Sequence, residues 1–380
     1  MHSIRLHYTL EPPSAADPTQ PTPSPRSLGG DEPGLQHPLM ALLQSVDLHG
    51  SISAAARELG LSYRHVWGEL KRWETSLGQS LIVWEKGQSA RLTEFGTKLM
   101  WAERQTQARL APQIQALRAD LERTFAIAFD SQAHVLTCYA SHDAALSRLQ
   151  DEAAGQGLHL DVRFCGSVDA IRALNEGRCL MAGFHVPLHP DTDSLSALTF
   201  RPLLQPGRHK LIGFAERSQG LMVPKGNPLG LDSLSTVVQR RARLALRDKG
   251  SGTRLLFDAL VQQAGVSGSD FEVTPQEEPS HLACAAAVAA GTADAALGIA
   301  SAARSQGLDF VPLQQEHYYL VCLKSAIDSP AVLALRQLLQ TPGWQQSLEQ
   351  LPGYRAAQAG VVQSLRTELP WWRLRPKRTR

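Results

Sequence analysis

Three features are scarce in this sequence: cysteines, aromatic side chains and long apolar runs. Five of the 380 residues are cysteines and 6% are aromatic. No stretch approaches the roughly 20 uncharged apolar residues that a membrane-spanning helix requires. The first ten residues contain Arg5 and two histidines but no apolar segment, which is not the pattern of a secretory signal. We therefore expect a cytoplasmic protein with no membrane contact.

The cysteines form no CxxC pair and have no histidine at metal-ligand spacing. They all lie within or beside apolar segments: Cys138, Cys165, Cys179, Cys284 and Cys322. Because free cysteine is among the most often buried residue types, we predict small core residues. A disulfide framework or a metal site is not expected.

Motifs of common enzyme classes are also missing. The sequence has no Walker loop and no HExxH motif. Ser141, His142 and Asp143 are triad residue types, but consecutive strand residues point to opposite faces and cannot form the relay. The net charge of +2 favours no partner by itself. We predict neither catalysis nor a cofactor.

Residues 39–77 have helical periodicity that is interrupted by turn residues. Apolar residues fall on one face of a first helix at Leu39, Leu42, Leu43 and Val46. We expect Ser53 to cap a short second helix that ends at Gly60, and Ser62 to cap a third helix from Tyr63 to about Leu77. Two helices joined by a short turn that contains glycine form a helix-turn-helix.

A hairpin and a long helix are predicted next. Residues 81–84 and 90–92 have the pattern of two short strands around a turn, which together form a wing. Thr93 is expected to cap a helix whose seam has spacings of three and four residues. The seam consists of Phe95, Leu99, Ala102, the polar Thr106, Leu110, Ile114, Leu117 and Leu121. We expect this seam to pair two copies in a homodimer or higher oligomer; packing on its own domain is the alternative.

From about residue 126 the chain alternates between strands and helices. Predicted strands are 134–140, 158–164, 180–186, 243–246, 293–298 and 318–324, and predicted helices are 143–153, 168–176, 253–264 and 281–291. Such alternation indicates a doubly wound, mostly parallel sheet. The fold class is therefore α/β: an N-terminal winged helix-turn-helix with a long linker helix, then a two-lobed α/β domain.

These patterns divide the chain into five parts. Residues 1–38 are rich in proline and serine and are predicted to be a disordered leader, with a proline-rich docking motif as the alternative. Residues 39–92 form the winged head, 93–125 the linker and dimerisation helix, and 126–355 the sensor domain. Residues 356–380 are a basic tail, either merely solvated or attracted to phosphates.

Residues 50–67, GSISAAARELGLSYRHVW, resemble the winged helix-turn-helix of LysR-type regulators. They are more similar still to ModE-type molybdate-responsive regulators, whose second helix also begins Ser-Tyr-basic and includes a tryptophan. Residues 92–96 resemble the end of the wing and the start of the linker helix in that family. The resemblance implies double-stranded DNA as the partner.

A recognition helix must present its N-terminal side chains to base edges while its other face packs inward. The candidate DNA contacts are Ser62, Tyr63, Arg64, His65, Lys71, Arg72, Lys86 and Arg91. We expect Arg64 to contact guanine or phosphate, and Lys86 and Arg91 to hold phosphates from the wing. Lys71 and Arg72 lie beside Glu69 and Glu74, so a solvated helix face is their alternative role.

Three strand-to-helix junctions, residues 139–143, 164–169 and 247–254, carry small polar side chains. Helix N-termini at the carboxyl ends of strands offer free N–H groups to anions. The candidate ligand-binding residues there are Ser141, Ser167, Ser251, Gly252, Thr253 and Arg254. Plain helix capping is the alternative role of the hydroxyl residues.

Residues 220–228, 247–254, 281–288 and 291–299 look like the binding-protein-like domain of some molybdenum-related proteins, which resembles type II periplasmic binding proteins. This implies two lobes, crossing strands and a ligand between the lobes. In oxyanion-binding relatives the donors are neutral, and the nearest matches are Ser141, Ser167, Thr253 and Tyr318. Three residues differ from those neutral donors and would allow a larger ligand: Arg254, His185 and His281. A structural role is the alternative for both histidines.

The combined interpretation is a one-component transcriptional regulator that binds promoter DNA under control of a small anionic ligand. Molybdate, tungstate, the molybdenum cofactor or a related metabolite are the expected ligands. Closure of the lobes would act on the DNA-binding heads through the linker helix. A molybdenum-cofactor-related enzyme and a solute-binding protein are the alternatives.

Overall fold

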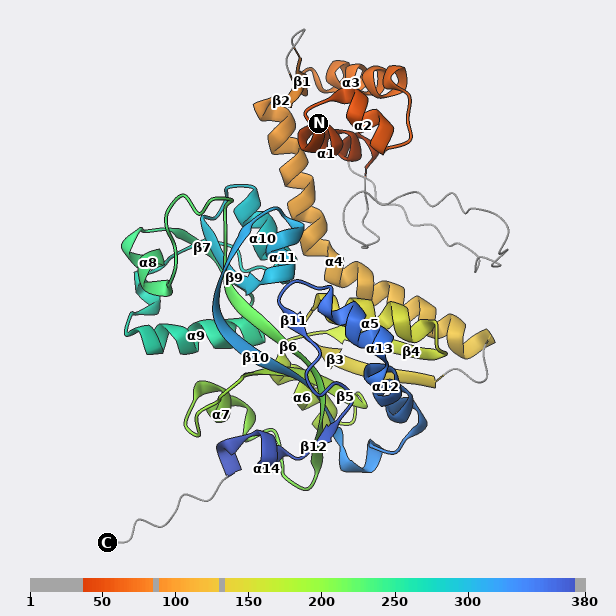
Figure 1. Ribbon diagram of the computed structural model, residues 1–380, viewed down its shortest axis with the longest axis vertical. Helices are drawn as coiled ribbons and strands as arrows, with labels where there is room; N and C mark the ends of the chain where they lie inside the picture. The colour runs from red at the N-terminus through yellow and green to blue at the C-terminus, as the bar shows by residue number, and fades with distance from the viewer. Residues whose placement is uncertain (1–36, 85–88, 130–133, 373–380) are drawn as a thin grey trace. The chain divides into compact units, whose positions relative to one another are not determined.

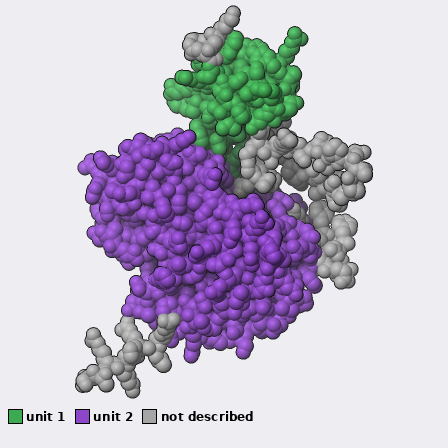
Figure 2. Space-filling view, viewed as in Figure 1, with its two compact units in different colours: residues 1–107 green, residues 108–380 purple. Residues whose placement is uncertain are grey.

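The computed structural model describes residues 37–84, 89–129 and 134–372. The chain divides into two compact units, residues 1–107 and 108–380 (Figures 1 and 2). The predicted leader up to residue 36, the wing residue Lys86 and the basic residues 373–380 lie outside the described residues.

The first unit is a three-helix head followed by a hairpin and the start of a long helix. Its elements are α1 (Pro38–His49), α2 (Ile52–Glu58), α3 (Tyr63–Leu77), the antiparallel strands β1 (Ile82–Val83) and β2 (Arg91–Leu92), and α4 (Glu94–Phe129), which continues into the second unit. Apolar side chains of these elements form one core, which includes Leu43, Val66, Leu70 and Leu81. The predicted winged helix-turn-helix is confirmed.

Helix caps set the geometry of this head, and one of them differs from the prediction. Ser51, not Ser53, caps α2, because its Oγ accepts the N–H of Ala54 at 3.3 Å. The earlier start places Ile52 in the core and leaves Ser53 exposed. Gly60 then turns the chain with a φ of 67°, which a residue with a Cβ rarely adopts.

The second unit is built on a ten-stranded sheet with the order β4-β3-β5-β10-β6-β9-β7-β8, in which β11 and β12 also pair with β6. The strands are β3 (His134–Ala140), β4 (Leu158–Phe164), β5 (Met181–Pro187), β6 (His209–Val223), β7 (Arg243–Ala245), β8 (Glu272–Val273), β9 (Ala295–Ile299), β10 (Asp309–Leu323), β11 (Tyr354–Arg355) and β12 (Val362–Gln363). We call the part around β3, β4 and β5 the first lobe, and the part around β7, β8 and β9 the second lobe.

Two 15-residue strands, β6 and β10, run between the lobes (Figure 1). Pairing is parallel within each lobe, but β10 is antiparallel to β5 and β6, and β6 is antiparallel to β9. The prediction of a mostly parallel sheet is therefore wrong at its centre. Residues 209–223 mix charged residues and glycines with apolar ones, so their local pattern did not predict β6.

Helices cover both faces of this sheet. They are α5 (Ala144–Ala154), α6 (Ser167–Asn175), α7 (Leu195–Phe200), α8 (Leu234–Gln239), α9 (Gly252–Ala264), α10 (His281–Ala289), α11 (Ala300–Ser305), α12 (Pro330–Gln340), α13 (Pro342–Glu349) and α14 (Leu365–Glu368), with short 3-10 turns at Gly268–Asp270, Lys324–Ala326 and Pro370–Trp372. The largest core reaches across both lobes beneath α5, α10, α12 and α13. Residues 356–372, grouped with the tail by composition, include β12 and α14.

The cysteines occupy the positions expected of core residues. All five are free; four are buried and Cys165 is half-buried. Burial raises the pKa of the Cys179 thiol to about 11, so this group stays protonated at neutral pH. Among the described helices, none combines the length and apolar character needed to cross a membrane.

Candidate functional site

The N-terminal turn of α3 is free of the core. Ser62 caps the helix by accepting the N–H of His65 at 3.2 Å. Tyr63, Arg64 and His65 are exposed, while Val66 and Leu70 on the opposite face are buried. The sequence pattern produces this split because apolar residues recur at a spacing of four and the polar residues fill the first turn.

The second turn of α3 is occupied by ion pairs. Lys71 Nζ lies 2.6 Å from Glu74 Oε2, and Arg72 lies 2.5 Å from Glu69 Oε2. Glu74 also accepts the N–H groups of Leu81 and Ile82, which ties β1 to α3. Burial alone would raise the pKa of Glu74, but these hydrogen bonds outweigh it and lower the pKa. Lys71 therefore has a structural partner in addition to any role toward DNA.

Aromatic rings continue this surface toward the hairpin. Tyr63 stacks on Trp67 with ring centroids 6.4 Å apart, and Trp67 meets Trp84 edge-on at 6.0 Å. Trp84 is 50% exposed, and Arg91 of β2 is also exposed. Sequence reasoning treated Trp84 only as part of a strand.

Seven of the nine candidate ligand residues lie close together between the lobes. In the first lobe, Ser141 Oγ and Ser167 Oγ are 3.4 Å apart, and the rings of His185 and Tyr318 have centroids 3.9 Å apart. From the second lobe, Gly252 approaches so closely that a Cβ on it would lie 3.4 Å from His185 Nδ1 and from Ser167 Oγ. The three junctions expected from the sequence thus converge.

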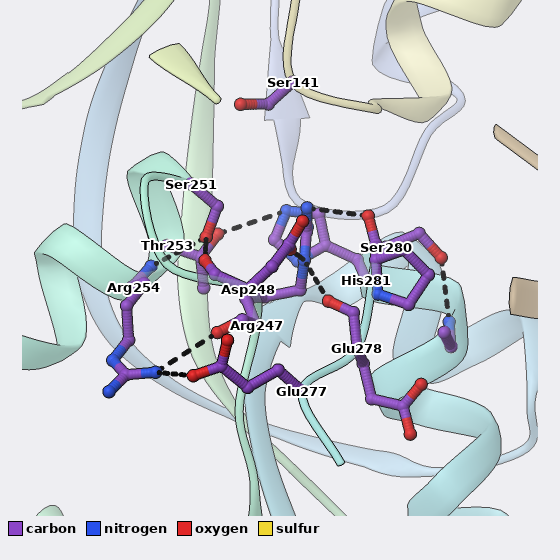
Figure 3. Close-up of polar contacts among 12 residues, drawn as sticks. Ser141, Arg247, Asp248, Ser251, Thr253, Arg254, Glu277, Glu278, Ser280 and His281 are labelled. Carbon is purple, nitrogen blue, oxygen red and sulfur yellow. Dashed lines mark hydrogen bonds and ion pairs between the residues drawn. The ribbon is translucent and has the colours of Figure 1, made fainter. Parts of the chain in front are cut away.

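The second-lobe side of the site is built on the N-termini of α9 and α10. Thr253 Oγ1 lies 3.4 Å from His281 Nε2 and accepts Nε2 of Gln219 at 3.1 Å (Figure 3). Ser280 caps α10 by accepting the N–H of Ala283 at 3.0 Å. Helix starts of this kind place backbone donors and a positive dipole end beside the side chains.

Ser251 and Arg254 belong to the edge of the site. Ser251 caps α9 and donates to Asp248 O at 2.9 Å. Arg254 points away from His281 and donates to Glu277 Oε1 at 3.0 Å (Figure 3). A hollow of about 200 Å³ lies beside them, lined also by Val168, Phe200 and Lys249.

The buried histidines of the site are neutral at physiological pH. Burial lowers the pKa of His185 and of His281 well below 6.5, and the positive charges of Arg217 and Arg247 lower both further. A neutral imidazole has one N–H donor and one acceptor nitrogen. Each ring can therefore serve a ligand in either role.

Sequence reasoning missed an arginine at the crossing of the long strands. Arg217 of β6 is ion-paired with Asp143, and its Nε donates to Glu316 Oε1 at 2.5 Å. Tyr354 donates to Asp143 at 2.8 Å, and Gln219 donates to Glu316 at 3.0 Å. This network joins both lobes through β6 and β10. Four polar residues, 216–219, lie between the apolar residues 211–215 and 221–223, and this pattern was the signal that β6 was a strand with one polar stretch.

Several buried polar atoms of the site have no hydrogen-bond partner within the described part of the chain. They are both ring nitrogens of His185, Gln219 Oε1, Arg247 Nη1, His281 Nδ1 and Tyr318 OH. Leaving such groups unpaired costs about 1–3 kcal/mol each, so clusters of them indicate a bound molecule or water. No group of three metal-ligating side chains occurs among the described residues.

The chain thus joins an N-terminal winged helix-turn-helix to a two-lobed α/β domain that has a polar site between its lobes. Residues 38–97 match the family described as bacterial regulatory helix-turn-helix protein, lysR family, and residues 149–340 match the PBP superfamily domain. The second match spans just over half of the chain, so the chain belongs to the PBP superfamily. The N-terminal head therefore carries a helix-turn-helix similar to that of the lysR family, and the PBP-like domain follows it in the chain.

Two curated relatives are uncharacterized proteins. YvgK of Bacillus subtilis (strain 168) is 29% identical over 200 residues, which are 53% of this chain and 64% of YvgK. A protein from the 5′ region of a ferredoxin 2Fe-2S gene of Clostridium pasteurianum is 31% identical over 109 residues, 28% of this chain and 96% of that protein. This chain thus covers less than two thirds of YvgK.

Solved structures are similar to this chain at lower sequence identity than these two relatives. An H2O2-bound mutant of OxyR from Corynebacterium glutamicum has a TM-score of 0.41 and 17% identity, with 80% of this chain and 92% of that chain covered. ArgP of Mycobacterium tuberculosis has a TM-score of 0.37 and 21% identity, with 80% and 95% covered. Scores at this level carry no argument about ligand or mechanism.

Proposed function

We propose that this protein is a transcriptional regulator that binds promoter DNA through the first turn of α3 and the hairpin, and that a small anionic ligand between the lobes changes its affinity for DNA. The main observation that supports this proposal is the cluster of buried polar atoms without partners around His185, His281 and Tyr318, between the lobes. Molybdate, tungstate and molybdenum-cofactor-related metabolites are the ligands we propose, on the resemblance of residues 247–254 and 281–299. The role is binding and not catalysis.

We further propose a cytoplasmic homodimer that is paired through the linker helix, residues 93–125. The proposed DNA contacts are Ser62, Tyr63, Arg64, His65, Lys71, Arg72, Lys86 and Arg91. Two heads related by two-fold symmetry would read an inverted repeat. A ligand can shift DNA binding only by its different affinity for the two forms of the dimer, and DNA must shift ligand affinity by the same factor.

The test compares wild type, Arg64→Ala and a control, Lys98→Ala, on a duplex from the chain's own promoter region and on a random duplex. Arg64 is exposed at the start of α3, so its loss should weaken specific binding by about 1–3 kcal/mol if it reads a base. Lys98 forms an exposed pair with Glu94 and should have little effect. Each titration is repeated with saturating molybdate or tungstate and followed by fluorescence anisotropy. Equal affinity of the wild type for both duplexes, with and without these ligands, would disprove the proposal.

A further inference from the structure

We infer that Arg247 neutralises the charge of a compact oxyanion in the interlobe site, and that residues 278–280 transmit this contact to α4. The inference rests on the proposed function and names the ligand class and the residue that selects it. Arg247 follows β7 and is 4% exposed. Arg247 begins the 247–254 motif, in which the sequence predicted Arg254 as the charged contact.

The hydrogen bonds of Arg247 leave one of its nitrogens free. Its Nε donates to Glu278 O at 3.1 Å and its Nη2 to Pro279 O at 3.0 Å (Figure 3). Its Nη1 is buried without a partner among the described residues. The nearest carboxylate, on Asp248, is 3.3 Å away but half-exposed, so water screens it. A buried guanidinium in this state is a ready partner for an anion.

The other arginines of the site are already neutralised. Arg217 lies between the carboxylates of Asp143 and Glu316, and Arg254 is paired with Glu277. In contrast, the charge of Arg247 acts on the uncharged imidazoles of the site, since it is among the causes that lower the pKa of His142, His185 and His281. Among the buried side chains of the described site, Arg247 therefore supplies the positive charge available to a ligand.

The geometry limits the size of that ligand. Gly252 of the second lobe comes close to His185 and Ser167 of the first, and a Cβ at Gly166 would lie 2.4 Å from Gly250 O. The lobes are thus in contact around the site. The unpaired donors of the site include Arg247 Nη1 and Tyr318 OH, and an oxyanion with several acceptor oxygens is the class of ligand that such donors bind.

Residues 278–280 are bonded to Arg247 on one side and to α4 on the other. Glu278, whose side chain is buried, accepts Arg109 Nε at 2.9 Å and Nη2 at 2.7 Å. Ser280 Oγ donates to Ala108 O at 3.2 Å. A ligand that engages Arg247 therefore acts on a segment that is bonded directly to α4.

The same helix is also bonded to the first lobe. Gln115 of α4 lies 3.1 Å from His142 Nε2, and Asp120 accepts Arg163 at 2.8 Å. Because α4 bridges both lobes, a change in their separation must alter one of these sets of bonds. We assign to Arg109 the positioning role that links the ligand site to the helix.

The first experiment measures binding of sodium molybdate, tungstate, sulfate and phosphate to the full chain by isothermal titration calorimetry. We expect at least one of them to bind the wild type and Arg247→Gln to lose at least 30-fold in affinity. The matched control Arg243→Gln removes an exposed arginine of β7, which is paired with Asp294, and should stay within twofold. Wild-type affinity in Arg247→Gln, or no binding of any of the four anions to the wild type, overturns the inference. Promoter preference is measured separately, so the DNA-binding proposal can survive that failure.

If Arg247→Gln does not fold, Arg247→Lys decides. A single ammonium cannot hold both residues 278–280 and the ligand, so affinity should fall about tenfold; wild-type affinity would overturn the inference.

For the link to α4, Arg109→Gln should keep ligand affinity within threefold but lose the ligand's effect on promoter affinity. The control Arg118→Gln, from an exposed pair with Asp151, should keep that effect. A full ligand effect in Arg109→Gln contradicts the link.

Discussion

His142 shows how burial converts an ordinary residue into one that depends on pH. Its ring is buried between Gln115 of α4 and Phe164, 4.9 Å from the centroid of the latter ring. Burial and the charge of Arg247 lower its pKa from 6.5 to about 4, although Asp143 raises it somewhat. The folded protein therefore binds fewer protons than the unfolded chain at mildly acidic pH.

The free energy of unfolding should therefore decrease as the pH falls. The stability that neutral His142 provides is present above pH 6.5 and is lost as the pH falls toward about 4. The slope is about 1.4 kcal/mol per pH unit for each such group, and His185 and His281 act in the same direction. Urea unfolding between pH 7 and 4.5 gives the free energy of unfolding as a function of pH. The slope of this plot should correspond to about one proton fewer in His142→Gln than in the wild type. His65→Gln, whose ring is exposed, is the control; an unchanged slope in His142→Gln would contradict the argument.

At the scale of elements, β6 and β11 carry two arginine ion pairs in opposite surroundings. Arg217 is buried between Asp143 and Glu316, whereas Arg355 is 65% exposed in its pair with Glu216, the neighbour of Arg217 on β6. Consecutive strand residues face opposite sides, which is why adjacent residues take part in such different pairs. The buried network fixes the crossing of the long strands.

We expect Arg217→Gln to destabilise the protein by about 3–5 kcal/mol, because it leaves two buried carboxylates without their cation. Arg355→Gln should change the stability far less, because its pair is exposed and screened by water. Urea unfolding of both variants at neutral pH measures the difference. Equal losses of stability would mean that the buried network does not hold the strands.

For the whole molecule, the seam of α4 bears on how two copies of the chain would assemble. Leu117 is 57% exposed and Leu121 is 39% exposed, one helical turn apart. The seam predicted from the sequence therefore retains apolar surface in its second half. A second copy of the chain would cover that surface and bring together two DNA-binding heads.

Replacement of Leu117 and Leu121 together by Glu should convert the dimer to a monomer, since the four new carboxylates of the two copies would repel one another across the seam. Sedimentation velocity measures the change in mass. Leu198→Glu, which alters another exposed leucine on α7, should leave the dimer intact. A monomeric wild type, or a double variant that stays dimeric, would show that the seam is not the dimer interface.

Local patterns were enough to predict most of the elements and many candidate residues. The cap at Ser62, the helical period of α3 and the strand-to-helix junctions at Ser141, Ser167 and Thr253 depend on neighbours within a few residues. The same reasoning found the wing and the long helix. Where it failed, as at Ser53, two caps lay within reach and burial of Ile52 decided between them.

Tertiary structure decided the rest, because pairings between distant residues leave no local period. The antiparallel course of β6 and β10 and the network of Arg217 join residues about a hundred positions apart, such as Arg217 and Glu316. In the tertiary structure Arg254 pairs with Glu277, and one nitrogen of Arg247 has no partner in the buried site. The sequence alone determined most of the segments that form helices and strands; which arginine faces a ligand was determined by how those segments pack.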